Sequence, residues 1–494
     1  MKIQKVYDAI ALNTENYEKN TTRDIRKKNS QYFTPFLISK YMTNIIIQNG
    51  LKKTMHVLEP SGGTGSLVTI FLLELVNMDF ENIIVDIFEL DEKIITILKT
   101  NLSFIETVFE EKGKKIRINI KCENFLKADI KVKYDIIIGN PPYKKIRKNS
   151  PEAMANSSFL YGQPNIYGLF LGKSLKLLNT DGKLVFLVPR SFFNGKYFSR
   201  IREFMYKNYS LTFIHSFESR IKVINNEILQ EIVIVKIEKK KVNNVLVNHS
   251  LGIDDIDINK VFVVEKKFIW DKNSLKIRLP ITTNDVEIIK KMDKLVYKLA
   301  DLNLKFNTGP VVDFRVKNFI SGKKMLDKYY PLIWCANFGL SSIRWPIYNL
   351  KYPQYISADV PKVNLLSKGN YLIVKRFSSK EENKYLKINI IRFYDINFEK
   401  FALENHVNYL NLKENDEEFL KGLFILLNSS LYNRYFAIIN GTTQINITDL
   451  NELPILQKNL IRELGKITEN IDYCNRKIWD NLVNKYVEQN VENK

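Results

Sequence analysis

The sequence predicts an α/β protein whose first half is a doubly wound, largely parallel sheet with helices on both faces. Short runs rich in Val and Ile alternate along this half with segments whose apolar residues recur at helical spacing. The apolar runs are continuous, as they are in parallel strands buried on both sides. Strand–helix repetition of this kind is typical of an open α/β sheet.

The elements follow one another without long gaps. Thr34-Pro35 predicts a helix start, because Thr caps a helix and Pro fits its first turn. We expect helices over residues 66–76, 92–111, 165–178 and 199–208. We expect strands over residues 55–60, 82–91, 115–126, 134–143, 182–193, 211–217 and 231–238.

The chain is too long for one core, since 494 residues exceed the size at which single domains stop growing. The strand–helix rhythm ends after about residue 240, and later segments mix aromatic residues with Lys and Asn. We therefore expect one domain over residues 1–285, with residues 1–30 as a polar lead-in, and a second over 286–494.

Composition narrows the class of protein. A net charge of +21 favours a polyanionic partner, although a basic protein with solvated lysines would show the same charge. Three widely spaced cysteines without a CxxC pair, and four scattered histidines, match neither a disulfide framework nor a metal site. Without a membrane-length apolar run or a signal-peptide core, the chain is expected in the cytoplasm.

A glycine-rich turn directly follows the first expected strand. Glu59-Pro60-Ser61-Gly62-Gly63-Thr64-Gly65 stands at the carboxyl end of the sheet, where α/β folds bind ligands. Glu89, at the end of the second strand, is placed to accept hydrogen bonds from ribose hydroxyls. A tight loop and a surface acid are the plainer alternatives, and the spacing between the two features favours a nucleotide site.

Asn124-Phe125 ends the third expected strand at the same edge of the sheet. The amide of Asn124 can pair with the edge of an adenine ring, and Phe125 can stack on its face. Taken alone, Phe125 would be core packing, so its value comes from the neighbouring motifs.

Asn140-Pro141-Pro142-Tyr143 ends the fourth expected strand, and its two prolines stop the strand and make the backbone rigid. The side-chain carbonyl of Asn140 and the backbone carbonyl of Pro141 can both accept hydrogen bonds from one amine. They would draw its lone pair out of conjugation, so that an aromatic exocyclic amine can attack a sulfonium methyl. Tyr143 offers a face for a base that has left the duplex stack. The alternative is an ordinary Pro-Pro turn.

In this order, these motifs resemble the TaqI-type, gamma-class N6-adenine DNA methyltransferases of restriction–modification systems. The resemblance implies a Rossmann-like methyltransferase core followed by an α+β target-recognition domain. It places Thr34, Glu59, Gly62, Glu89, Asn124 and Pro142 against S-adenosylmethionine, in motifs that also hold Pro60, Ser61, Gly65 and Phe125. Asn140, Pro141 and Tyr143 would hold the target adenine. It further implies double-stranded DNA as substrate, a cognate restriction endonuclease acting on the same site, and a monomeric enzyme.

Two positions depart from the family pattern. The family usually has Asp where Asn124 stands, so the adenine contact here would be neutral. Many members also have an aromatic before the last core strand, whereas residues 222–231 contain none. Ile224, or a phenylalanine from elsewhere such as Phe33 or Phe217, would then face the base opposite Tyr143.

The second half carries residue types that bind DNA. Arg and Lys hold phosphates or read guanine, and Asn or Gln reads adenine. Most single lysines are simply solvated. Residues 374–380 and 440–446 resemble recurring segments of recognition domains, and Arg315 is added as a basic residue of the same half. The predicted DNA-binding residues are Arg315, Lys375, Arg376, Lys380, Gln444 and Asn446.

Other functions remain open from sequence alone. Protein glutamine has an amide that the same tetrapeptide could hold, and a structured RNA is another substrate. A fused restriction enzyme is disfavoured, because only about 30 residues precede Thr34-Pro35, which matches the first cofactor segment of the resembling family. A DNA-binding protein on an inactive core is disfavoured by the intact motifs.

Overall fold

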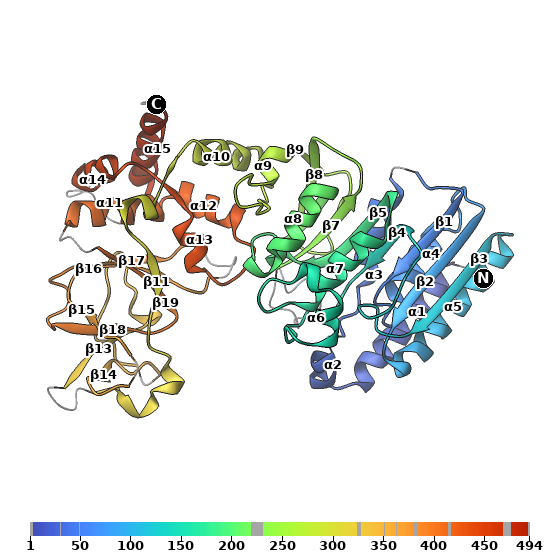
Figure 1. The fold of residues 1–494 in the computed structure, drawn as a ribbon, viewed down its shortest axis with the longest axis horizontal. Coiled ribbons are helices and arrows are strands. Elements are labelled where there is room, and N and C mark those ends of the chain that lie inside the picture. Colours follow the sequence, from blue (N-terminus) through green and yellow to red (C-terminus); the bar gives the residue numbers. More distant parts are fainter. Residues whose placement is uncertain are drawn as a thin grey trace. The chain divides into compact units, whose positions relative to one another are not determined.

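The computed structural model divides the chain into two compact units, Met1–Thr282 and Thr283–Lys494 (Figure 1). Each unit has its own sheets and helices. The residues that the structure describes are 3–29, 31–48, 50–218, 231–323, 328–349, 351–361, 363–378, 384–412, 416–467 and 476–492.

The first unit is built on a nine-stranded sheet with the order β3-β2-β1-β4-β5-β7-β6-β8-β9. Neighbouring strands from β3 to β5 are parallel, while β7 runs antiparallel to both β5 and β6. β8 continues parallel to β6, and β9 closes the edge antiparallel to β8. The strands are β1 (Thr54–Glu59), β2 (Asn82–Glu89), β3 (Lys115–Cys122), β4 (Tyr134–Gly139), β5 (Leu178–Pro189), β6 (Ser210–Phe217), β7 (Ile232–Glu238), β8 (Asn244–Ser250) and β9 (Phe262–Glu265). The sequence prediction of a largely parallel α/β sheet is confirmed.

Helices connect and cover the strands of this sheet (Figure 1). They are α1 (Ile3–Asn20), α2 (Arg23–Asn29), α3 (Phe36–Ile47), α4 (Ser66–Leu75), α5 (Glu92–Glu111), α6 (Pro151–Ala155), α7 (Ile166–Leu177), α8 (Ser199–Asn208) and α9 (Lys266–Ile269). The polar lead-in is therefore helical. α7 packs on β5 and α8 on β6, whereas α1, α3, α4 and α5 share one hydrophobic core with the sheet.

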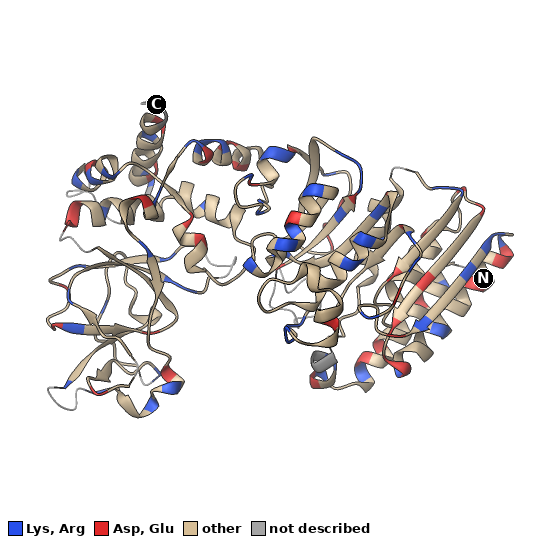
Figure 2. Cartoon of the chain, in the orientation of Figure 1, with Lys and Arg blue, Asp and Glu red and all other residues tan. Residues whose placement is uncertain are grey.

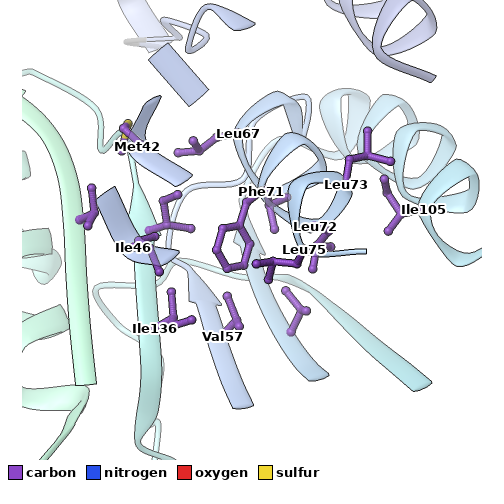
Figure 3. Close-up of a cluster of buried hydrophobic side chains, with 14 of the residues drawn as sticks. Met42, Ile46, Val57, Leu67, Phe71, Leu72, Leu73, Leu75, Ile105 and Ile136 are labelled. Carbon is purple, nitrogen blue, oxygen red and sulfur yellow. The ribbon is translucent and has the colours of Figure 1, made fainter. Parts of the chain in front are cut away.

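That core joins the helices to alternate strand residues (Figure 3). Phe71 of α4 lies over Val57 of β1, with Ile136 of β4 and Ile46 of α3 beside it. All four side chains are at most 3% exposed. Burying an aliphatic or aromatic side chain of this size contributes about 1.5–3 kcal/mol, so this layer holds the strand ends that carry the site.

Two local expectations differ from the structure. Thr34 was expected to cap a helix, but the N-cap of α3 is Pro35 and makes no side-chain hydrogen bond. The hydroxyl of Thr34 instead accepts a hydrogen bond from Nδ2 of Asn140 at 3.2 Å, so a tertiary partner replaces the cap. The third strand ends at Cys122 rather than near residue 126, because the carbonyl of Asn124 starts a turn by accepting from the backbone of Lys127 and Ala128.

The second unit combines sheets whose strands pair mostly antiparallel, with β13 and β18 as a parallel pair, and a group of helices, in keeping with the α+β prediction. A four-stranded sheet has the order β11-β19-β16-β17, and a five-stranded sheet has the order β12-β14-β13-β18-β15. β10 and β20 form a separate pair. The strands are β10 (Tyr297–Lys298), β11 (Phe306–Thr308), β12 (Ile320–Ser321), β13 (Tyr329–Ile333), β14 (Tyr355–Ser357), β15 (Leu366–Ser367), β16 (Asn370–Lys375), β17 (Ile388–Ile391), β18 (Lys400–Leu403), β19 (Val407–Leu412) and β20 (Pro454–Ile455).

The helices of this unit lie mostly after its sheets in the sequence. They are α10 (Thr283–Asp293), α11 (Glu417–Asn428), α12 (Ser430–Ile439), α13 (Ile447–Asn451), α14 (Lys458–Ile467) and α15 (Arg476–Glu492). Gly422 of α11 faces α14 so closely that an added Cβ would lie 1.8 Å from the carbonyl oxygen of Ile461. The two helices therefore depend on this glycine for their close approach.

Charged residues occur on elements of both units (Figure 2). The net charge by itself therefore does not locate a nucleic-acid surface. Within the described part of the chain, no helix is both long enough and apolar enough to cross a membrane.

Candidate active site

A cavity of about 420 Å³ lies where the carboxyl ends of β1, β2, β3 and β4 meet in the first unit. Ligand pockets typically have volumes of this order. Most of the predicted cofactor and catalytic residues line it: Thr34, Glu59, Pro60, Ser61, Gly62, Glu89, Asn124, Phe125, Asn140 and Pro142. Gly65, Pro141 and Tyr143 are described but are not part of this lining.

The glycine-rich turn brings the backbone close to the neighbouring strand. The amide of Gly62 donates to the carbonyl of Phe88 at 2.8 Å, and a Cβ on Gly62 would lie 2.5 Å from Ile87. Gly65 begins α4 with φ +80°, where a side chain would also meet Leu98 at 2.5 Å. Only glycine fits these two positions, and the cavity wall is therefore largely backbone.

Glu89 ends β2 with both carboxylate oxygens facing backbone donors. Oε2 accepts from the amide of Gly63 at 2.8 Å, and Oε1 accepts from Leu90 at 2.8 Å and Asp91 at 2.9 Å. These bonds fix the carboxylate at the cavity wall. These bonds use three of the about four lone-pair sites of the carboxylate, and the one left on Oε2 can accept a hydrogen bond from a ribose hydroxyl.

Glu59 ends β1 and is 1% exposed, and its Oε2 has no hydrogen-bond partner. Burial raises the pKa of this carboxyl well above its ordinary value of 4.5, and the negative charge of Glu89 raises it further. A buried carboxyl without a partner is costly unless a cation or donor approaches it. The ammonium and sulfonium groups of S-adenosylmethionine are both positively charged and could partner this carboxyl, so the residues present fit this cofactor.

Aromatic rings close the part of the cavity that follows β3. Phe125 is 2% exposed, and its ring centroid lies 5.4 Å from that of Phe88 and 5.2 Å from that of Phe170. Lys173 on α7 donates from Nζ to the carbonyls of Phe125 and Ala128, and thereby anchors the turn. Phe125 is thus both packed and cavity-lining, which suits a planar ring.

Asn140 is held in one orientation at the end of β4. Its Nδ2 donates to the carbonyl of Tyr32 at 3.0 Å and to the hydroxyl of Thr34 at 3.2 Å. Its Oδ1 accepts from the hydroxyl of Tyr143, which is also 2.9 Å from the carbonyl of Leu187. Both amide protons are used, while Oδ1 keeps a second lone pair for a further donor.

Burial raises the pKa of the Tyr143 hydroxyl well above its ordinary value of 10.0, with the nearby Tyr167 adding to the effect. The hydroxyl therefore stays protonated and remains a donor. The ring of Tyr143 lies nearly parallel to that of Tyr32, with centroids 6.4 Å apart and an interplanar angle of 18°. The hydroxyl of Tyr143 thus braces Asn140, a contact that the sequence did not predict.

The sequence predicted that Ile224, Phe33 or Phe217 would face the target base opposite Tyr143. Ile224 lies outside the described residues. Phe217 is 4% exposed within the hydrophobic core, while Phe33 lines the cavity and contacts Tyr17 edge to face at 5.6 Å. Tyr32 is the aromatic residue that the structure sets parallel to Tyr143, and sequence reasoning passed over it.

Sequence reasoning also missed cavity-lining residues outside the motifs. Lys144 directly follows the tetrapeptide, and Ile166 and Phe170 come from α7. The run Lys144-Lys145-Ile146-Arg147-Lys148 was the available signal for the first, because four basic residues next to the tetrapeptide that is predicted to hold a base suit a phosphate backbone. No local pattern distinguishes Ile166 or Phe170 from core residues of a buried helix.

In the second unit, three segments converge around Arg376: the end of β16, the turn between β18 and β19, and the loop before α13. The backbone amide of Arg376 donates to the carbonyl of His406 at 2.8 Å, and its carbonyl accepts from Ile445 at 2.7 Å. Its guanidinium donates to the carbonyl of Asn405 at 2.9 Å. With the Gln444 amide turned so that its oxygen faces Arg376, the orientation that satisfies both groups, the guanidinium also donates to that oxygen at 2.9 Å. Arg376 therefore orders Gln444 and the turn.

The remaining predicted DNA-binding residues are in different settings. Arg315 is exposed beside the ring of Phe314, and Lys375 ends β16. Asn446 precedes α13 and donates to Asp449 at 3.2 Å. Lys380 lies outside the described residues.

Comparisons with known proteins identify the family. The family described as the Eco57I restriction-modification methylase matches residues 67–223. The chain is 31% identical over 481 residues to the Type II methyltransferase M.BsuBI of Bacillus subtilis, covering 93% of this chain and 95% of the relative. It is 28% identical to the Type II methyltransferase M.PstI of Providencia stuartii, covering 94% of each chain.

The solved structure of the Type IIL restriction-modification enzyme MmeI in complex with DNA aligns with a TM-score of 0.58. The alignment has 12% identity and covers 98% of this chain and 73% of that one. At this identity the likeness shows the fold, and it agrees with an α/β core. The chain therefore belongs to the Type II restriction–modification methyltransferases, which makes it a DNA methyltransferase with S-adenosylmethionine as its cofactor and DNA as its substrate.

Proposed function

We propose that this enzyme methylates the N6 amine of adenine at a specific site in duplex DNA. The observation that carries the proposal is the orientation of Asn140, whose two amide protons are engaged by Tyr32 and Thr34. This orientation leaves Oδ1 of Asn140 to accept a hydrogen bond from the substrate, and a primary amine has the proton to donate. Methylation of a ring carbon would instead need a nucleophile, and neither described cysteine, Cys122 nor Cys335, is among the cavity-lining residues.

The residues would act by holding the amine in position. Oδ1 of Asn140 and the backbone carbonyl of Pro141 accept hydrogen bonds from the two protons of the amine, which localises its lone pair. S-adenosylmethionine, when bound, supplies an electrophilic methyl group on a sulfonium. The adenine must leave the duplex stack to arrive there, and the ring of Tyr143 offers it a stacking face. The proton of the methylated amine is then lost to water.

The cofactor would lie along the carboxyl edge of β1, β2 and β3. Glu59 would face its cationic groups, Glu89 its ribose hydroxyls, and Asn124 and Phe125 its adenine ring. The burial of Glu59 without a partner and the fixed carboxylate of Glu89 support this arrangement. The backbone wall formed by Pro60, Ser61 and Gly62, with Gly65 at the start of α4, would let the cofactor approach closely.

The first unit would thus be the catalytic domain and the second the target-recognition domain. The cluster around Arg376 and Gln444 supports this division, because arginine and amide side chains read base edges. We further propose that the enzyme acts as a monomer beside a cognate restriction endonuclease that cuts the same site. RNA adenine and protein glutamine remain substrates to be excluded by the product assay.

Product identification tests the proposal. Full-length enzyme is incubated with labelled S-adenosylmethionine and with DNA, RNA or protein, and the labelled nucleoside or amino acid is identified. N6-methyladenine in DNA is expected. Label only in N4-methylcytosine, 5-methylcytosine, RNA or protein would refute it.

Asn140→Ala tests the mechanism. Transfer is expected to fall below detection while cofactor affinity stays within a few-fold of wild type, because the substitution removes the acceptor for the amine. Asn208→Ala, on the exposed end of α8, is the matched control and should keep full activity. Turnover by Asn140→Ala close to wild type would show that Asn140 is not needed.

A further inference from the structure

Asn124 stands where the resembling family usually has Asp, and its amide has one fixed orientation. Its Nδ2 donates to Oε1 of Glu152 at 3.0 Å, and its Oδ1 accepts from the amide of Leu126 at 3.0 Å. If the amide were turned over, its oxygen would face a carboxylate and its NH₂ group would face an N–H donor. Because a carboxylate only accepts and a backbone N–H only donates, both neighbours enforce the same orientation.

Each atom of this amide keeps one unused hydrogen-bonding position. Oδ1 has a second lone pair and Nδ2 a second proton, and Asn124 lines the cavity next to Phe125. An acceptor beside a donor complements the edge of adenine, where the N6 amine donates and N1 accepts. A hypoxanthine ring reverses both, since O6 accepts and N1–H donates. An aspartate at this position would offer acceptors only.

Glu152 is placed by the docking of α6 on the turn that follows β3. Asn156, which is 7% exposed at the end of α6, donates to the carbonyl of Leu126 and to that of Glu152, both at 3.0 Å. Ser150 caps the helix by accepting from the amide of Ala153. The carboxylate of Glu152 therefore lies on a short helix that is hydrogen-bonded to the turn after β3. This is the turn that contains Asn124.

We propose that Glu152 is a positioning residue that fixes the amide of Asn124, so that the cavity accepts adenine and rejects hypoxanthine as the base of its cofactor. This rests on the proposed placement of the cofactor adenine at Asn124 and Phe125. Glu152 itself does not touch the ligand. Glu152 acts by preventing the Asn124 amide from turning over. Its loss should therefore change the preference of the cavity for adenine over hypoxanthine, without removing a contact to the ligand.

The test compares the affinities of full-length protein for S-adenosylhomocysteine and S-inosylhomocysteine by calorimetry. The wild type should prefer the adenine compound. Glu152→Gln and Glu152→Ala should reduce that preference about tenfold, the effect of losing one hydrogen bond to a charged group. In methyl transfer, Glu152→Gln should raise KM for the cofactor and leave kcat unchanged. Asp129→Asn, which removes an exposed charge near the same turn, is the control and should match wild type.

The ratio of the two affinities separates orientation from folding, because a loosened α6 would weaken both ligands alike. Preference retained in both Glu152 variants but lost in Asn124→Ala would overturn the role of Glu152 and leave the adenine placement standing. Preference retained in Asn124→Ala as well would overturn the placement and the inference together. Neither result depends on which base of the DNA is methylated, since DNA is absent from the assay.

Discussion

Replacing Glu59 with Gln should stabilise the free protein and weaken cofactor binding. Glu59 is 1% exposed, Oε2 has no partner, and burial raises the pKa of the carboxyl well above 4.5. Below pH 4.5 the group is protonated in both the folded and the unfolded chain and has no effect on the pH dependence. Above that pH the unfolded chain releases the proton and the folded chain keeps it. Stability therefore falls by about 1.4 kcal/mol per pH unit until the raised pKa is reached.

Glutamine has nearly the same shape as glutamate and does not ionise. The stability of Glu59→Gln should therefore not fall with pH in this way. Urea unfolding of both proteins without cofactor at pH 5 and pH 6 should show the stability of the wild type falling relative to that of Glu59→Gln as the pH rises. Glu110→Gln, on the exposed face of α5, is the control and should follow the wild type. Parallel pH dependence of wild type and Glu59→Gln would refute the reasoning.

The same group should ionise when the cofactor binds, because a cation then partners the carboxylate. Calorimetry at pH 5 in two buffers with different ionisation heats should show the wild-type protein releasing protons on binding. Glu59→Gln should release fewer protons than the wild type and bind more weakly. Equal proton release by the two proteins would show that Glu59 stays neutral in the complex.

Three further substitutions probe the sites. Tyr143→Phe keeps the ring but removes the donor to Asn140, so kcat should fall only about tenfold. In Tyr143→Ala the ring is lost as well, and kcat should fall much further. Equal losses of kcat in the two variants would exclude a role for the ring. Gly65→Ala places a side chain at φ +80° and 2.5 Å from Leu98, so it should lower the free energy of unfolding by about 2–5 kcal/mol. Gly113→Ala, in a turn with open space around it, is the control and should cost about 1 kcal/mol. Equal urea midpoints for the two variants would contradict this. Arg376→Ala should relax sequence preference in DNA binding while the salt dependence stays unchanged, since its guanidinium holds Gln444; a smaller salt slope would indicate a phosphate contact.

Much of the first unit follows from local sequence patterns. Continuous apolar runs and helical spacing depend on neighbours a few residues apart, so they place strands and helices to within a few residues. Because the carboxyl ends of parallel strands meet at one edge, the four groups of polar residues at the ends of the first four strands predict one cavity. The order of β7 between β5 and β6 has no such local signal, since it depends on which strand edges pair after the chain returns.

By itself, the sequence determined the α/β class, the strand ends that carry the site, and the family to which those motifs belong. Only the tertiary structure decided which partners the side chains have. Thr34 bonds to Asn140 rather than capping its own helix, and Asn124 bonds to Glu152 on a separate helix. The physical reason is that these hydrogen bonds join residues distant in the chain. Their geometry comes from the packing of helices on the sheet, which no short window of sequence contains.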